Sequence, residues 1–203
     1  MPHRHMLPPL LLAAVMMILT GCALPFGQEP PPIRFYVLSA AAAEPVAASP
    51  RPVMVGVSRV VLPEYLDTPR IVTRTGANEL RLADLDQWRG TLRDTATATL
   101  VDNLAAQIPS DGVVALPFRG PVRPDFQVAV EVSKFERDAE GLVTLAARWQ
   151  LLSGDGRTPL AMQRATYRRP APADDYAAIV AAMSATLADL SRDIASAIRI
   201  RAR

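Results

Sequence analysis

Two stretches near the middle of the chain carry an apolar residue at every second position. Alternation of this kind predicts β-strands that bury one face and leave the other in water. The apolar positions are Phe126, Val128, Val130 and Val132 in the first stretch and Val143, Leu145, Ala147, Trp149 and Leu151 in the second. Turn-forming residues at 138–141 and 153–156 separate these stretches from each other and from a third segment, 159–168. The pattern therefore predicts an antiparallel meander.

Apolar residues recur with a helical period in two other regions. One stripe begins near Asp86 and ends before Pro109, and it consists of Trp88, Leu92, Ala96, Leu100, Leu104 and Ile108. The second begins near Asp174 and consists of Tyr176, Ile179, Val180, Met183, Leu187, Leu190, Ile194 and Ile198. Each helix is preceded by a pair of aspartates, Asp84 with Asp86 and Asp174 with Asp175, which we interpret as N-terminal caps.

Shorter signals complete the expected fold. Residues 53–60 read as a strand and 63–66 as a turn. Residues 71–75 and 80–82 flank Gly76-Ala77-Asn78, a hairpin turn whose glycine and asparagine tolerate positive φ. Residues 110–112 resemble a turn before a short strand at 113–116. We expect one α+β domain over 53–203, with a mainly antiparallel sheet and two amphipathic helices packed on it.

The amino terminus carries an export signal. A basic head is followed by a short apolar run, Leu10 to Leu19, and then by Leu19-Thr20-Gly21-Cys22, which resembles a bacterial lipobox. This resemblance implies a signal peptide at 1–21, lipidation of Cys22, and a proline- and alanine-rich linker at 22–52 with a short strand near 34–39. An ordinary secretory signal or an uncleaved anchor is the alternative. Ala23, where an aspartate favours the inner membrane, predicts the outer membrane, on its periplasmic side.

Composition narrows the possible chemistry. The only histidines, His3 and His5, lie in the leader, and the only cysteine is the predicted lipid site Cys22. A catalytic triad, a cysteine nucleophile and a histidine-ligated zinc site are therefore excluded from the mature chain. We expect no enzymatic activity, no cofactor and no metal site, although a carboxylate-dependent envelope hydrolase stays open as an alternative. A formal net charge of +2 gives no reason to expect nucleic-acid binding.

Three segments carry a family resemblance. They are Phe35-Tyr36-Val37-Leu38, the stretch from Leu62 to Val72 that contains Leu-Pro-Glu-Tyr-Leu, and the stretch from Leu85 to Leu92 around Trp88. With them the chain resembles the ABC-type transport auxiliary lipoproteins of the PqiC and YmbA type. The resemblance implies a strand, a Leu-Pro-x-Tyr-Leu turn and a tryptophan-led helix.

The same resemblance implies partners. Family members work beside MCE proteins, which form lipid conduits between the two membranes, in some systems with an inner-membrane permease and ATPase. They are non-catalytic and assemble as rings, so the resemblance implies a homo-oligomer that is held to the membrane by its lipid anchor. A docking subunit of such a machine is the leading hypothesis, and an accessory lipoprotein for assembly or secretion of another envelope protein is the alternative.

Five residues are candidates for contact with a partner or with another copy. Pro63, Tyr65 and Leu66 could present a binding turn or could plug the end of the core. Trp88 and Leu92 could pack inside the protomer or against a neighbouring subunit.

The last helix offers two further candidates for contact with lipid. Its apolar stripe is either core or the lining of a lipid groove. The terminal arginines Arg199, Arg201 and Arg203 either complement the helix dipole or touch anionic lipid head groups.

Overall fold

The computed structural model describes residues 30–42, 52–108, 110–117, 120 and 123–202. The predicted signal peptide, Cys22 and most of the predicted linker lie outside these residues. Ile33–Arg203 forms one compact unit. Its elements are β1 (Arg34–Tyr36), β2 (Val53–Val57), the short 3₁₀ helix η1 (Glu64–Leu66), β3 (Arg70–Gly76), β4 (Glu79–Trp88), α2 (Leu92–Gln107), β5 (Ser110–Ala115), β6 (Phe126–Arg137), β7 (Leu142–Ser153), β8 (Pro159–Pro170) and α3 (Tyr176–Arg201).

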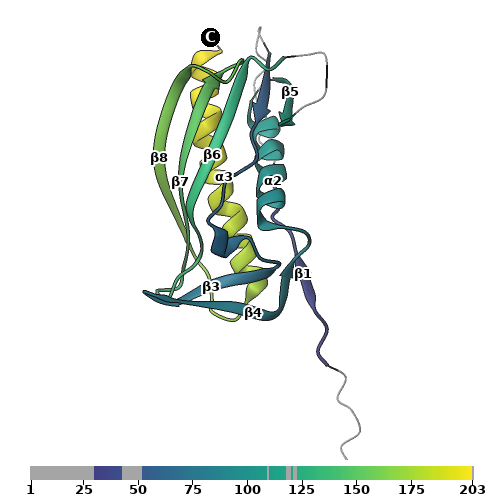
Figure 1. Ribbon diagram of the computed structural model, residues 1–203, viewed down its shortest axis with the longest axis vertical. Helices are drawn as coiled ribbons and strands as arrows, with labels where there is room; N and C mark the ends of the chain where they lie inside the picture. Colours follow the sequence, from purple (N-terminus) through teal and green to yellow (C-terminus); the bar gives the residue numbers. More distant parts are fainter. Residues whose placement is uncertain (1–29, 43–51, 109, 118–119, 121–122, 203) are drawn as a thin grey trace, which may run out of the picture. The chain divides into compact units, whose positions relative to one another are not determined.

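The predicted meander is confirmed. β6 and β7 pair antiparallel from Phe126 opposite Ser153 to Arg137 opposite Val143, and β8 pairs antiparallel with β7. The alternating apolar residues of β7 are all buried. In Figure 1 the three strands form a curved layer, and α3 runs along one face of it beside α2.

The sheet is mixed, which corrects the expectation of a mainly antiparallel one. The path of neighbouring strands is β1-β4-β3-β6-β2-β5. β2 pairs with β6 near its start and β3 pairs with it at its end, so both lie along one edge of β6. β7, followed by β8, lies along the other edge. β1 pairs parallel with β4, β2 with β5 and β6, and β3 with β6. Parallel neighbours need long crossover connections. Between β2 and β5, for example, the connection contains the β3–β4 hairpin and α2. The alternation within one strand carries no information about a partner that is so distant in sequence.

The first helix begins six residues later than predicted. Asp86 and Trp88 lie in β4, where both are buried, so Trp88 does not lead the helix and Asp86 does not cap it. Gly90 adopts φ 105°, which turns the chain after the strand. Thr91 is the N-cap, and its hydroxyl accepts the Asp94 N–H at 3.0 Å. The four-residue spacing of Trp88 and Leu92 is therefore a coincidence between a strand end and a helix start.

Some of the other local predictions are confirmed and others are wrong. Asp175 caps α3 as predicted by accepting the Ala178 N–H at 2.9 Å, but Asp84 lies inside β4. Residues 110–112, predicted as a turn, are the start of β5. The hairpin at 76–78 is present, although neither its glycine nor its asparagine has positive φ. The predicted final helix and the end of α2 before Pro109 are confirmed.

The segment after β1 is fastened across the two helices. Leu38 is buried, while its neighbour Val37 is about half exposed at 52%. Side chains of α2 and α3 form hydrogen bonds with the backbone here. Three side-chain oxygens accept backbone N–H groups: Thr95 Oγ1 from Leu38 (3.1 Å), Ser184 Oγ from Ser39 (3.1 Å) and Asn103 Oδ1 from Ala41 (2.8 Å). The Thr99 hydroxyl donates to the Leu38 carbonyl (3.3 Å). We call residues 37–41 the strap.

The strap predicts opposite effects for two adjacent substitutions. Leu38→Ala removes a buried side chain and should lower the free energy of unfolding by about 2–4 kcal/mol. Val37→Ala alters an exposed side chain and should change it by less than about 0.5 kcal/mol. Chemical denaturation monitored by circular dichroism measures both. Equal effects of the two variants would show that the strap is not packed as described.

Candidate functional site

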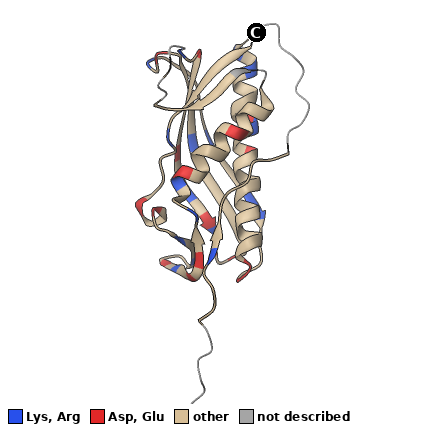
Figure 2. Cartoon of the chain, turned by 90° about the vertical axis from the view of Figure 1, so that its right-hand side faces the viewer, with Lys and Arg blue, Asp and Glu red and all other residues tan. Residues whose placement is uncertain are grey.

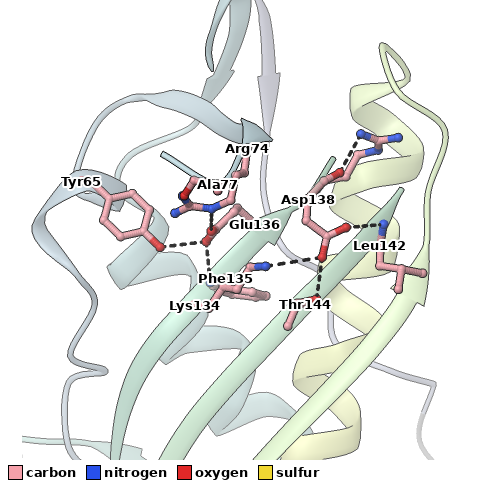
Figure 3. Close-up of polar contacts among 10 residues, drawn as sticks. Tyr65, Arg74, Ala77, Lys134, Phe135, Glu136, Asp138, Leu142 and Thr144 are labelled. Atoms are coloured by element: carbon pink, nitrogen blue, oxygen red, sulfur yellow. Dashed lines mark hydrogen bonds and ion pairs between the residues drawn. The ribbon is translucent and has the colours of Figure 1, made fainter. Parts of the chain in front are cut away.

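A carboxylate lies completely buried near the end of β6. Glu136 has no exposed surface, and its oxygens accept three hydrogen bonds, from the Tyr65 hydroxyl at 2.9 Å, the Arg74 Nε at 3.1 Å and the Phe135 backbone N–H at 2.9 Å. Figure 3 shows the Tyr65 and Arg74 side chains converging on Glu136. A buried carboxylate is tolerated only with such charge pairing and hydrogen bonding, so these partners are required by the fold.

Tyr65 reaches Glu136 because of the turn before it. The Leu66 N–H donates to the Pro63 carbonyl at 3.0 Å, closing the 3₁₀ turn, and the Leu66 side chain is buried in the core. With that anchor in place, the hydroxyl of Tyr65 points at the carboxylate. The Arg74 guanidinium lies over the Tyr65 ring, 5.9 Å from its centroid, which adds a cation–π contact to the ion pair.

This setting shifts the ionisation of the phenol. Burial raises the pKa of Tyr65 to about 12, and the negative charge and hydrogen bond of Glu136 act in the same direction, against a smaller opposite effect of Arg74. The phenol is therefore a hydrogen-bond donor at neutral pH and no source of protons.

A second carboxylate closes the β6–β7 turn. Asp138 accepts hydrogen bonds from the Leu142 N–H at 2.9 Å, the Thr144 hydroxyl at 3.2 Å and the Lys134 ammonium at 3.4 Å. Burial acts to raise the pKa of Asp138, but these donors outweigh it and hold the pKa below its usual value. All the contacts lie within one hairpin, so this carboxylate stabilises the turn.

A third buried carboxylate attaches the first strand. Asp86 of β4 accepts hydrogen bonds from Arg34 Nη2 at 2.9 Å and from the Tyr36 hydroxyl at 2.8 Å, both on β1. It serves the β1–β4 pairing, where the sequence suggested a helix cap.

The five candidate contact residues do not form one surface. Leu66, Trp88 and Leu92 are buried in the protomer core. Pro63 and Tyr65 are partly exposed. Only the turn at 63–66 therefore keeps candidate residues within reach of a partner, and its tyrosine already bonds to Glu136.

The terminal helix also places its candidates. Its apolar stripe packs in the core. Arg199 Nη1 donates to the Gln107 carbonyl at 2.8 Å and Arg201 donates to the Leu160 carbonyl, so both bind the protein's own backbone. Arg203 lies outside the described residues.

Sequence reasoning missed Glu136 and Arg74. The available signal was the acid at position 136, where the even-numbered alternation of β6 calls for an apolar residue. A register shift between Val132 and Lys134 breaks that alternation, so that Phe135 and Glu136 are both buried, on opposite faces. No pattern in Tyr65 or Arg74 indicates that they meet this residue.

Both oxygens of each of these three carboxylates accept from donors of the protein itself. This arrangement favours a structural role, because a substrate would have to displace internal partners. Within the part of the chain that the structure describes, no three or more metal-ligating side chains are grouped to hold an ion. The helices of the described residues include none that is both long and apolar enough to cross a membrane.

Removing the buried charge should be costly. Glu136→Gln leaves Arg74 without its anionic partner and replaces one carboxylate oxygen by an NH₂ group, which cannot accept the hydrogen bonds that the surrounding donors offer. The free energy of unfolding should therefore fall by about 2–4 kcal/mol. Glu131→Gln is the matched control, because Glu131 lies on the same strand in an exposed pair with Arg148 and should cost less than about 1 kcal/mol. Urea unfolding measures both, and similar losses would contradict the role of Glu136.

The raised pKa of Tyr65 predicts a loss of stability in alkali. Between pH 10 and about pH 12 the unfolded chain releases this proton while the folded chain keeps it, so the Tyr65 contribution is complete below pH 10 and is lost as pH rises through 12. Tyr65→Phe should be less stable at pH 8 but should lose less stability between pH 10 and 12. Unfolding curves across this range test it. Parallel curves for the two proteins would refute the assignment.

Solved structures share the fold. A crystal structure described as an uncharacterized protein matches with a TM-score of 0.68 and 22% identity, over 83% of this chain and 99% of that chain. Protein XCC0632 from Xanthomonas campestris matches with a TM-score of 0.70 and 21% identity, over 83% of this chain and 97% of its own. At these identities the similarity establishes the fold alone.

The sequence comparisons give the family. None of the curated proteins matches the chain. The family model described as ABC-type transport auxiliary lipoprotein component matches residues 36–195, from the end of β1 to the last turns of α3. The matched region contains every strand after β1 and includes Glu136 with its partners Tyr65 and Arg74. The chain belongs to the ABC-type transport auxiliary lipoprotein family.

Proposed function

We propose that this protein is a non-catalytic, lipid-anchored subunit of an MCE-type intermembrane lipid transport system, which docks or supports the periplasmic conduit at the outer membrane. The family match over residues 36–195 carries this proposal, because it makes the chain an auxiliary component of a transport system. The lipobox-like sequence before Cys22 supports the anchor, and Ala23 supports the outer membrane.

The buried carboxylates support a non-catalytic role. The acceptor oxygens of Glu136, Asp138 and Asp86 are occupied by internal donors, and a general acid or base must be free to reach a substrate. We therefore expect the described surface to act by providing contact area for a partner protein.

An exposed apolar ridge on β1 provides such an area. Phe35 of β1 is 54% exposed, and the residues on either side of the strand, Ile33 and Val37, are 48% and 52% exposed. Among the described strands, β1 is the last at its edge of the sheet, and none of them pairs with its outer side. Adjacent exposed apolar side chains of this kind mark protein contacts. We assign this ridge to the MCE partner and expect the protein to form a homo-oligomer.

Site-specific photo-crosslinking in cells tests the proposal. A benzophenone amino acid at position 35 of the full-length protein should give an adduct that contains an MCE protein by mass spectrometry. The same amino acid at the exposed position 168 on β8 is the matched control and should not.

The remaining outcomes contradict the conduit-docking role. An adduct with a different envelope protein would favour an accessory for assembly or secretion. Adducts with other copies of this chain alone, or no adduct at all, would remove the MCE assignment from the ridge.

A further inference from the structure

A small basic cavity lies where the β3–β4 hairpin meets the start of α3. Its volume is about 240 Å³, and its walls come from β3, β4, β6, the β6–β7 turn and the residues around the first turn of α3. Arginines from three strands line it: Arg74 of β3, Arg81 of β4 and Arg137 of β6. Figure 2 shows residues of both charge signs close together around this hairpin.

The three arginines of the cavity differ in their partners. Arg74 pairs with the buried Glu136, and Arg81 pairs with Asp174 at 3.2 Å. Arg137 donates from Nε to the Ala171 carbonyl at 2.9 Å and from Nη1 to the Asp138 carbonyl at 3.0 Å. These are neutral acceptors. Of the three lining arginines, Arg137 is therefore the one without an ion pair to a carboxylate of the described residues.

The carboxylate on the rim is loosely held. The side chain of Asp174 is 79% exposed and that of Arg81 is 55% exposed, so their ion pair is weak in water. An incoming anion can replace Asp174 at Arg81 without exposing a buried charge. Tyr176 and Ile179 at the start of α3 also line the cavity, and the Asp175 carboxylate caps that helix and offsets the positive end of its dipole.

We propose that this cavity binds a phosphate group. Guanidinium groups arriving from three strands suit a ligand whose acceptor oxygens point in several directions, as in phosphate, better than a planar carboxylate that one guanidinium can hold. Thr73 also lines the cavity, and the volume of about 240 Å³ leaves room for a phosphate and the first atoms attached to it. Free phosphate and the head group of an anionic phospholipid share this chemistry.

The site is independent of the conduit-docking role, because none of its residues lies on the β1 ridge. Failure of the crosslinking experiment would leave it standing, and its own failure would leave the docking proposal standing.

Two substitutions with opposite effects test the site. The full-length ¹⁵N-labelled protein in uncharged detergent micelles is titrated with inorganic phosphate and with dihexanoyl phosphatidic acid. Saturable shifts are expected at the backbone amides of Arg81, Arg137 and Tyr176. Arg81→Gln should raise the dissociation constant at least about fivefold, since a charged hydrogen bond is lost. Asp174→Asn should lower it about threefold, since a competing carboxylate is removed.

The control is Arg168→Gln, which removes the same charge as Arg81→Gln at an exposed position of β8 and should leave the affinity for phosphate unchanged. Tighter binding of the phosphatidic acid would identify a lipid head group as the source, and equal binding would identify free phosphate. Either result supports the site. Absence of saturable shifts, or the same loss in Arg81→Gln and Arg168→Gln, would overturn it.

Discussion

A carboxylate without access to water fixes three segments at the end of β6. Glu136 is accommodated there because Tyr65, Arg74 and a backbone N–H all donate to it. Taking a carboxylate out of water costs several kcal/mol, and that cost is offset only when every partner is in place. The 3₁₀ turn and β3 follow each other in sequence, but Glu136 of β6 is 71 residues from Tyr65 and 62 from Arg74, so this one side chain ties β6 to both. The basic cavity beside Arg74 depends on that arrangement as well.

The division of charge around this point separates structure from recognition. Arg74 is engaged by an acid that solvent cannot reach, so it contributes rigidity. Arg137 is held by two carbonyls that fix its position without cancelling its charge. Arg81 is paired with an acid that water already surrounds. A ligand would therefore meet one arginine fixed by an ion pair, one that is positioned but uncompensated, and one whose partner is replaceable.

Local sequence patterns predicted the elements whose formation is itself local. The alternation in 126–151 gave the correct strands because one face of the meander is buried along its length. The apolar stripe of α3 and the Asp175 cap were equally readable. The start of α2 was misplaced because Trp88 satisfies the helical spacing while it closes a strand. The parallel pairings of β1, β2 and β3 and the partners of Glu136 join residues distant in sequence, and no local period encodes them. The polar cluster was therefore beyond sequence reasoning, apart from the irregular acid at position 136.

The strap has a mechanical consequence. If Cys22 carries the predicted lipid, eleven residues separate it from Arg34, the first residue of β1. At roughly 3.5 Å for each fully extended residue, this leash spans at most about 40 Å. The domain is then confined to a shell of that depth above its membrane. Any pull on the leash reaches β1 first, through its pairing with β4, and then the bonds that clamp residues 38–41 to α2 and α3. A short leash with a doubly fastened end would transmit force to the folded domain and would allow little slack.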